Sequence, residues 1–236
     1  MNVLVTAGNT QTPIDDVRAI TNIFTGRTGA ALALEAYRQG HDVTLLTSHP
    51  ERIGELTADR LDSRRWRAIP YRTFDELAAA MERHIAGATP DVVIHCAAVG
   101  DYRCVGVYAP AEGTRFEAGP NRWHGSQLVD RAAAKVKSDE AELWLRLERA
   151  PKLVDKIRSD WGFGGALVKF KLEAGVSAER LLEVAERSRC QSRADLMVAN
   201  TLEDASQWAF VGPPYVRTPR AELPAALLKA IESLRA

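Results

Sequence analysis

The stretch that decides the fold is VLVTAGNTQTPIDDVRAITNIFTGRTG, residues 3–29. An apolar strand at 3–6 runs into a small-residue turn, and after a polar loop a second such turn precedes a helix predicted to begin near Gly26. A glycine turn before a helix N-terminus binds anions, because unpaired N–H groups and the positive end of the helix dipole face the ligand. The loop is too long for the G-x-G-x-x-G turn of NAD enzymes, so the pattern favours another phosphorylated ligand.

The composition excludes several classes of protein. Lysine plus arginine equals aspartate plus glutamate, at 31 each in 236 residues, so no global field favours nucleic acid or an anionic membrane. No apolar run approaches the roughly 20 residues needed to span a bilayer, and no signal peptide opens the chain. We therefore expect a cytoplasmic protein. The three cysteines and five histidines lack metal-ligand spacing, and no disulfide is expected.

Short apolar strands alternate with amphipathic helices along most of the chain. Strands are predicted at residues 3–6, 42–46, 66–70, 92–97, 143–147, 166–170 and 196–199, and helices at 30–39, 74–86, 152–160, 178–189 and 221–235. This alternation indicates an α/β fold, a doubly wound, mostly parallel Rossmann-like sheet covered on both faces. Gly40 reads as the C-cap of the first helix. The second strand ends at residues 45–50 without the carboxylate that holds the ribose of NAD.

Residues 103–134 depart from the alternation, with four glycines, three aromatic residues and only short strand signals. A loop of this length in a compact domain is usually functional or disordered. We expect a single Rossmann-like domain over residues 1–236, with residues 104–134 as a flap or arm over the site. The alternative is a mobile surface insertion.

Four predicted strand ends are unusually polar, and ligands of open α/β sheets bind beyond such ends. They read TAGNT (6–10), AAVGDYR (97–103), KFKLE (169–173) and ANT (199–201).

Five motifs of the chain resemble those of a known family. Residues 6–29, then AAVGDY (97–102), AAKVKSDEAELWLRLERAPKLVDKIRSDW (133–161), VKFKLEAG (168–175) and LMVAN (196–200) are similar, in this order, to phosphopantothenoylcysteine synthetase. FKLE and the PKL-to-DW stretch are closer to stand-alone synthetases than to the synthetase half of bifunctional flavoproteins. No flavin domain precedes Met1, so decarboxylation is not expected.

The resemblance implies a ligase of coenzyme A biosynthesis that joins 4′-phosphopantothenate to L-cysteine through an acyl-nucleotide. CTP or ATP would be the co-substrate, with Mg²⁺ to neutralise pyrophosphate and no metal ligands assigned to the protein. The family generally works as a homodimer, in which an arm of one subunit completes its neighbour's site. Activation is a chemical necessity, because an amine cannot expel oxide from a carboxylate at useful rates.

For the nucleotide, the resemblance points first to Lys135, the leading lysine of a K-x-K motif. Its ammonium would stabilise charge on the α-phosphate as a catalytic group. Lys137 would assist it, although both lysines also fit a solvated edge strand, and Ser138 replaces a lysine of some relatives. The other implied nucleotide residues are Asp101, Phe170, Lys171 and Asn200. From the residues alone, Asp101 also reads as a helix cap, Phe170 as core and Asn200 as a turn amide.

For the acyl substrate, Asn22 would hold the acyl carbonyl during attack by cysteine, although a loop asparagine is usually a turn residue. Ala97 and Ala98 would leave room for substrate against exposed backbone N–H groups. The implied turn and phosphate residues are Gly8, Asn9, Thr10, Thr25, Gly26, Arg27 and Gly29. Asn9 and Gly100 depart from the family's commoner residues.

Two other functions stay open from the sequence. An NAD(P)-dependent short-chain reductase would share the fold, but the chain lacks its glycine turn, its acidic residue after the second strand and a Tyr-x-x-x-Lys pair. A non-catalytic nucleotide- or metabolite-binding module would explain the departures at Asn9, Gly100 and Ser138 and the long insertion.

Overall fold

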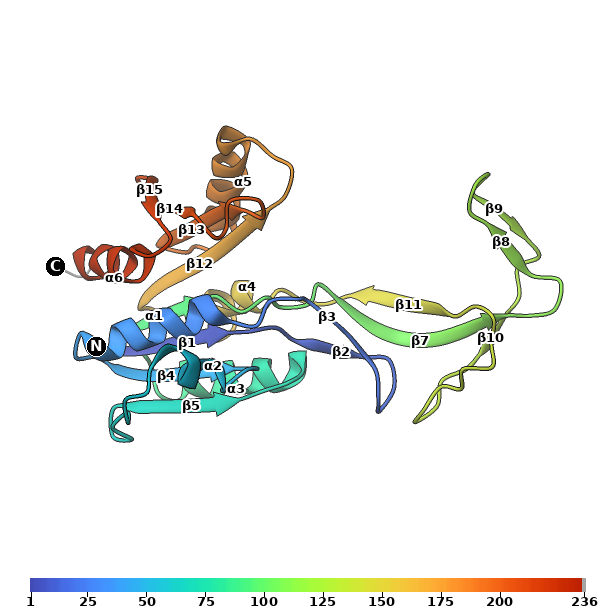
Figure 1. Cartoon of the computed structure of the whole chain (residues 1–236), viewed down its shortest axis with the longest axis horizontal. Coiled ribbons are helices and arrows are strands. Elements are labelled where there is room, and N and C mark those ends of the chain that lie inside the picture. Colours follow the sequence, from blue (N-terminus) through green and yellow to red (C-terminus); the bar gives the residue numbers. More distant parts are fainter. Residues whose placement is uncertain (235–236) are drawn as a thin grey trace. The chain divides into compact units, whose positions relative to one another are not determined.

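A computed structural model describes residues 1–234 (Figure 1). The chain divides into two compact units. The first unit contains residues 1–10, 23–99 and those from 152 onward, and the second unit contains residues 11–22 and 100–151. The second unit therefore extends beyond the predicted insertion at 104–134 and also takes in part of the opening loop.

The first unit is built on an eight-stranded sheet in the order β15-β14-β13-β12-β6-β1-β4-β5. Six of these strands are parallel, and in chain order they follow the 3-2-1-4-5-6 pattern of the Rossmann fold. The strands are β1 (Asn2–Ala7), β4 (Asp42–Thr47), β5 (Trp66–Pro70), β6 (Val92–His95), β12 (Ala166–Glu173), β13 (Leu196–Thr201), β14 (Trp208–Gly212) and β15 (Val216–Pro219). The predicted doubly wound fold is confirmed.

Six helices are present in the described residues: α1 (Arg27–Arg38), α2 (Arg52–Leu56), α3 (Phe74–Ala86), α4 (Leu153–Ser159), α5 (Ala178–Gln191) and α6 (Leu223–Ser233). All five predicted helices exist, and the short α2 was not predicted. Arg235, the predicted end of the last helix, lies outside the described residues. A capping box between Thr73 and Glu76 begins α3. Gly40 follows α1 at φ +93°, as expected for a residue that ends a helix.

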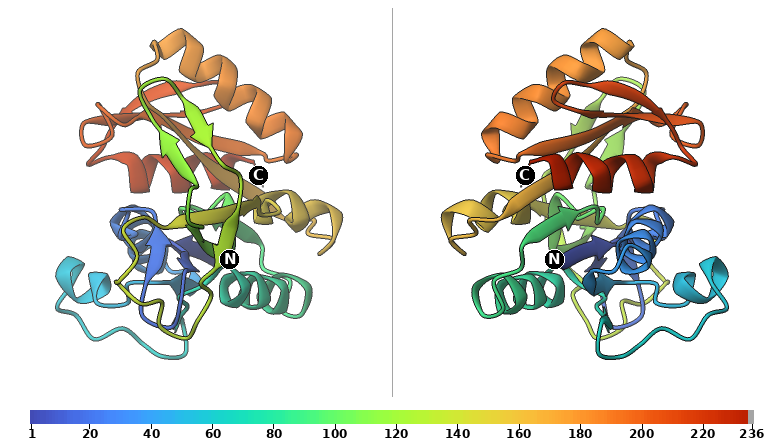
Figure 2. Two further views of the ribbon diagram at one scale, coloured as in Figure 1. Left: turned by 90° about the vertical axis from the view of Figure 1, so that its right-hand side faces the viewer. Right: turned by 90° about the vertical axis from the view of Figure 1, so that its left-hand side faces the viewer.

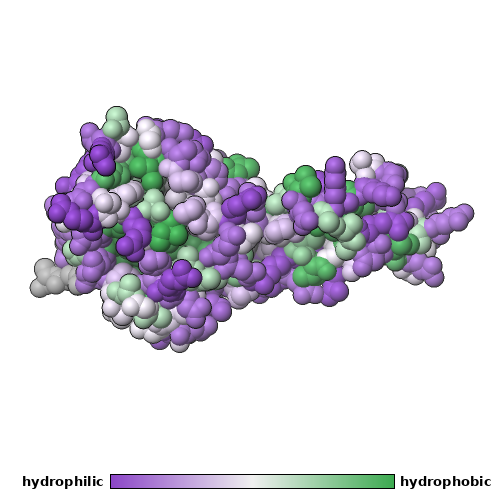
Figure 3. Space-filling model, turned by 90° about the horizontal axis from the view of Figure 1, so that it is seen from below, coloured by the Kyte–Doolittle hydropathy of each residue, from purple (hydrophilic) through white to green (hydrophobic). Residues whose placement is uncertain are grey.

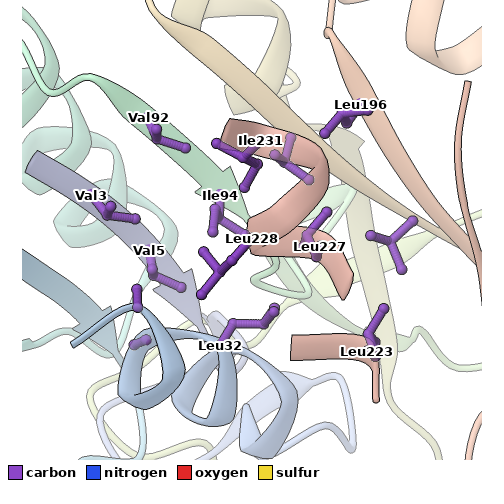
Figure 4. Close-up of a cluster of buried hydrophobic side chains, with 14 of the residues drawn as sticks. Val3, Val5, Leu32, Val92, Ile94, Leu196, Leu223, Leu227, Leu228 and Ile231 are labelled. Atoms are coloured by element: carbon purple, nitrogen blue, oxygen red, sulfur yellow. The ribbon is translucent and has the colours of Figure 1, made fainter. Parts of the chain in front are cut away.

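The core lies between the sheet and helices on both of its faces (Figure 2). On one face, Val3 and Val5 of β1 pack with Leu32 of α1 and with Leu227 and Leu228 of α6 (Figure 4). On the other face, residues of α5 pack against Met197 and Ala199 of β13. Strands covered on both faces have continuous apolar sequences, which is why these strands could be predicted from the sequence.

The second unit is antiparallel. Its three-stranded sheet has the order β10-β7-β11, and two short hairpins accompany it. The strands are β2 (Gln11–Pro13), β3 (Ala19–Thr21), β7 (Tyr102–Pro110), β8 (Arg115–Glu117), β9 (Arg122–His124), β10 (Leu128–Asp130) and β11 (Trp144–Arg149). The strand predicted at 143–147 is thus β11, which belongs to this sheet and not to the parallel one. Its alternation with Arg146 and Glu148 suits a sheet whose faces are not both buried.

Aromatic and apolar side chains hold this small sheet together and also mark its surface. Phe116 lies 5.2 Å from Trp123 and 5.5 Å from Trp144 between ring centroids, and the two tryptophans are 4.6 Å apart. Tyr102 and Leu147 remain 55% and 43% exposed. Figure 3 shows hydrophobic patches interrupting the polar surface of this unit.

Candidate functional site

Two glycine turns of the opening segment meet in the first unit. Gly8 and Gly26 both have positive φ, +92° and +79°. A Cβ on Gly26 would lie 2.8 Å from the Gly8 Cα, and a Cβ on Gly29 would lie 2.6 Å from the Ala7 Cβ. Only glycine permits these approaches. The strand-to-helix turn of a Rossmann fold is therefore rebuilt from two pieces, with residues 11–22 inserted between them.

The start of α1 is electropositive. Its N-cap, Gly26, offers no side-chain hydrogen bond, and the first turn contains no acidic residue. The amides of this turn therefore keep the partial positive charge of a helix N-terminus. Thr25 and Arg27 lie beside it in sequence, half-buried and exposed respectively. The predicted anion-binding geometry is present, and the ligand that uses it remains a prediction.

Arg220 adds a cation that the sequence did not reveal. Its guanidinium donates a hydrogen bond to Thr28 Oγ1 in the first turn of α1. Within residues 1–234, no carboxylate pairs with Arg220. The nearby Cys96 does not neutralise it, because burial raises the pKa of that thiol to about 12. The contact spans 192 residues of sequence, so no local pattern could have found it.

The ends of β1 and β6 continue to pair at the point where the strand order reverses. Asn9 and Ala98 form a parallel bridge, and the Ala98 amide donates to the Gly8 carbonyl at 2.8 Å. The Ala97 amide donates to Thr6 Oγ1 at 3.2 Å. Both amides are thus used within the fold and do not supply the N–H groups expected to face the substrate. Their small side chains still lie at the switch point where open sheets bind ligands.

Ser48 fixes the residue that follows the first glycine. The Asn9 amide donates to Ser48 Oγ at 2.9 Å, and that hydroxyl lies 3.2 Å from Asn9 Oδ1. Asn9 and Thr10 are both buried. The buried Tyr71 hydroxyl donates to the Ala7 carbonyl at 2.7 Å, and burial raises the pKa of Tyr71. Serine and tyrosine contacts across strands carry no sequence signal, and these two were missed.

The predicted nucleotide residues of the first unit lie on β12 and β13. Phe170 is half-buried and packs against the core, which agrees with the interpretation of Phe170 as a core residue. Lys171 Nζ lies 2.9 Å from Glu173 Oε1, so its charge is paired. Asn200 is buried within β13 and does not lie in a turn. Their contact with a nucleotide stays a prediction.

A buried lysine accompanies them. Lys169 Nζ donates to Ser192 Oγ at 2.6 Å and to the Ser188 carbonyl at 3.1 Å. Ser192 Oγ donates in turn to Asp155 Oδ1 at 2.7 Å. Burial lowers the pKa of Lys169 to about 8. The neighbouring His95 is buried, and burial and the charge of Lys169 lower its pKa to about 4.

The remaining predicted residues, Asn22, Asp101, Lys135 and Lys137, belong to the second unit. All four are exposed. Lys135 and Lys137 flank the buried Val136 and line a pocket with Ser138 and Asp139. The segment is not a strand, so the edge-strand interpretation of this pair was wrong. Each unit therefore presents its own group of predicted site residues.

Within residues 1–234, no three His, Cys, Asp or Glu side chains come together in a way that would hold a metal ion. The helices of the same residues include none with the length and apolarity to cross a bilayer.

Comparison with known proteins identifies relatives. Residues 1–110 match the family model of the DNA/pantothenate metabolism flavoprotein C-terminal domain. The coenzyme A biosynthesis bifunctional protein CoaBC of Thermococcus kodakarensis is 34% identical over 201 residues, which are 85% of this chain and 41% of that protein. CoaBC of Escherichia coli K12 is 26% identical over 210 residues, 88% of this chain and 42% of that protein. The chain thus spans about two fifths of these relatives.

Solved structures share the fold. A DNA/pantothenate metabolism flavoprotein from Streptococcus pneumoniae superposes with a TM-score of 0.76 at 23% identity, covering 99% of each chain. The Cab2 mutant H337A in complex with phosphopantothenate-cysteine gives a TM-score of 0.69 at 17% identity, over 98% of this chain and 86% of that one. The reductase and the non-catalytic module gain no support from these relatives. The chain is thus similar to DNA/pantothenate metabolism flavoprotein C-terminal domains, by sequence over residues 1–110 and by fold over nearly its whole length.

Proposed function

We propose that this protein is a ligase that joins 4′-phosphopantothenate to L-cysteine, using CTP or ATP, in coenzyme A biosynthesis. One observation carries the proposal. The family's motif residues Gly8, Gly26, Ala98 and Asn200 come from four separate segments, and each lies at or just beyond the carboxyl end of a strand of the first unit's sheet. Such a rim is where open α/β sheets bind their ligands.

The proposed chemistry has two steps. A carboxylate oxygen of phosphopantothenate attacks the α-phosphorus of the nucleoside triphosphate, and pyrophosphate leaves. The amine of cysteine then attacks the acyl carbon, the nucleoside monophosphate leaves, and the amine loses a proton as the amide forms. Both steps build negative charge on oxygen, which positioned cations and N–H donors stabilise.

The start of α1 is the proposed binding site for a phosphoryl group. Its amides, the side chain of Arg27 and the guanidinium of Arg220 supply positive charge there. We propose the phosphate of phosphopantothenate as the ligand. Asn22 is proposed to hold the acyl carbonyl, from its match to the family's motif alone.

The proposed nucleotide residues are Asp101, Lys135, Lys137, Phe170, Lys171 and Asn200. Lys135 is proposed to stabilise charge on the α-phosphate. Mg²⁺ enters the proposal only as the counter-ion of the triphosphate, a usual mode for an ion that keeps several waters and binds phosphates. Contact between these residues and a nucleotide is inferred from the motifs.

Pyrophosphate release tests the proposed function directly. We expect release with phosphopantothenate, cysteine, Mg²⁺ and either CTP or ATP, and formation of phosphopantothenoylcysteine by mass spectrometry. Parallel reactions with each nucleotide identify the one that is used. Absence of product with both nucleotides, from protein that binds phosphopantothenate, would sink the ligase assignment.

Substitution of Lys135 tests the mechanism. Lys135→Ala should lower turnover about 10²-fold or more, because one preorganised charge at a reacting centre contributes that much. Lys229→Ala is the matched control, since Lys229 is an exposed lysine of α6 and should leave turnover unchanged. A Lys135→Ala enzyme with near-normal turnover would remove this residue from the mechanism.

A further inference from the structure

The loop that joins β2 to β3 holds the lysine segment of the second unit by its backbone. Asp15 Oδ2 accepts a hydrogen bond from the Val136 amide at 3.0 Å. Arg18 Nη2 donates to the Val136 carbonyl at 2.6 Å. The amide of the next residue, Asp16, donates to the Ala134 carbonyl at 3.0 Å. An acidic side chain therefore binds the N–H of Val136, and a basic side chain binds its C=O. We call Asp15, Arg18 and Val136 the clamp.

The Asp15 carboxylate is buried and accepts several hydrogen bonds. Its side chain has no exposed surface, whereas that of Arg18 is 42% exposed. Besides Val136, the carboxylate accepts the amides of Val17 at 2.9 Å and Arg18 at 2.7 Å, and it pairs with the Arg18 guanidinium at 2.6 Å. These hydrogen bonds, that of the Arg18 side chain first, hold the pKa of Asp15 well below its usual range. The clamp is therefore charged at neutral pH.

The clamp decides which way the two lysines face. Val136 is buried, while its neighbours Lys135 and Lys137 are exposed and line the same pocket. Without a fixed backbone, the ammonium groups of Lys135 and Lys137 would be free to move apart, since like charges repel each other. Binding both the N–H and the C=O of Val136 prevents rotation of the segment about its own axis.

We propose that Asp15 and Arg18 are positioning residues that hold Val136 and thereby place the Lys135 ammonium for nucleotidyl transfer. The inference rests on the proposed function for its chemistry and on the clamp for its geometry. Neither residue touches the reacting atoms in this role; each acts through the backbone of Val136. Accurate placement matters because an error of about 1 Å in a catalytic group can lower a rate by about 10²-fold.

Asp15→Asn tests the role. The amide keeps the shape of the side chain but loses the charge that binds Arg18 and the Val136 amide. We expect turnover to fall about tenfold or more, with KM for cysteine and phosphopantothenate little changed, because positioning acts on the transition state. The loss should appear in formation of the acyl-nucleotide and not in its reaction with cysteine. Asp16→Asn, which alters an exposed carboxylate next door, should behave as wild type.

Hydrogen exchange gives a readout that does not depend on activity. In Asp15→Asn, the Val136 amide should exchange faster, and trypsin should cleave after Lys135 and Lys137 sooner, than in wild type or Asp16→Asn. Arg18→Lys serves as the second variant if Asp15→Asn does not fold; one ammonium cannot reproduce a guanidinium fork, so intermediate exchange and turnover are expected.

Two results would overturn the positioning role. One is unchanged exchange at Val136 in a folded Asp15→Asn protein, which removes the clamp. The other is faster exchange with unchanged turnover, which separates the clamp from catalysis. Failure of the ligase proposal looks different, because wild type would then form no product while the exchange experiment still decides whether the clamp exists.

Discussion

No carboxylate of residues 1–234 neutralises the charge of Arg220. This arginine contacts Thr28 at the positive end of α1, and burial lowers its pKa. Two positive groups in one place oppose each other unless an anion binds between or beside them. At the scale of single residues, this arrangement explains a half-buried arginine better than a role in stability does.

Arg220→Gln should therefore weaken binding of phosphorylated ligands. We expect a loss of about tenfold or more in affinity, the usual size for a hydrogen bond to a charged group. Calorimetric titration with phosphopantothenate and with pyrophosphate would measure it. Arg217→Gln is the matched control, because Arg217 stacks on Trp208 and is exposed. Equal affinity in wild type and Arg220→Gln would exclude Arg220 from the phosphate site.

At the scale of elements, the β1-to-α1 connection shows how a fold keeps its geometry around a long insertion. The Gly8 and Gly26 turns pack backbone to backbone, so the helix begins where it would begin after a short turn. The sequence predicted the strand, the helix and its start near Gly26. It did not predict that the two turns touch, because residues 11–22 separate them and the contact depends on the path of that inserted segment.

Gly26→Ala tests this packing. The positive φ of Gly26 makes alanine unfavourable by about 1–2 kcal/mol, and the clash with Gly8 should add about 1–3 kcal/mol. Gly40→Ala is the control, since Gly40 also has positive φ but an added Cβ would meet no atom of residues 1–234 within 4 Å. Urea unfolding should rank the variants wild type, Gly40→Ala, Gly26→Ala. Equal losses in both would show that only φ matters.

At the scale of the whole molecule, the two units differ in how they are stabilised. The first unit buries its sheet on both faces, whereas the second relies on an aromatic cluster and leaves Tyr102, Leu128 and Leu147 exposed. Exposed apolar residues of this kind often mark protein interfaces. We propose that the second unit forms a homodimer interface.

Sedimentation equilibrium tests that proposal. Wild type should sediment as a dimer, and Leu147→Asp should shift the equilibrium towards monomer by placing a charge in the apolar surface. Leu202→Asp is the control, since Leu202 is a similarly exposed leucine of the first unit. A monomeric wild type at micromolar concentration would refute the dimer.

Stability should depend on pH through Lys169. The pKa of this lysine falls from 10.5 to about 8 on folding, so between these values the unfolded chain binds the proton that the folded chain has released. Stability therefore rises with pH in that window. Lys169→Met should flatten the rise in urea midpoints between pH 8 and 9, and Lys229→Met should not. Parallel curves for Lys169→Met and wild type would contradict the assignment.

The variant comparison is needed because other groups act in the opposite direction. Burial raises the pKa of Cys96 to about 12 and also raises that of Tyr71, so both retain protons in the folded state that the unfolded chain loses. Their contribution lowers stability at higher pH. The difference between wild type and Lys169→Met removes these shared effects.

The sequence by itself determined the parallel sheet, five helices and the segments that carry the predicted site. These features are local, because buried strands and amphipathic helices show a characteristic spacing of apolar residues along a short stretch of sequence. The tertiary structure alone decided which distant groups meet. The Gly8–Gly26 contact, Arg220 at Thr28, the used amides of Ala97 and Ala98, and the Asp15 clamp on Val136 each join residues that are far apart in the chain. Such contacts depend on chain topology, which leaves no periodic pattern of residues in the sequence.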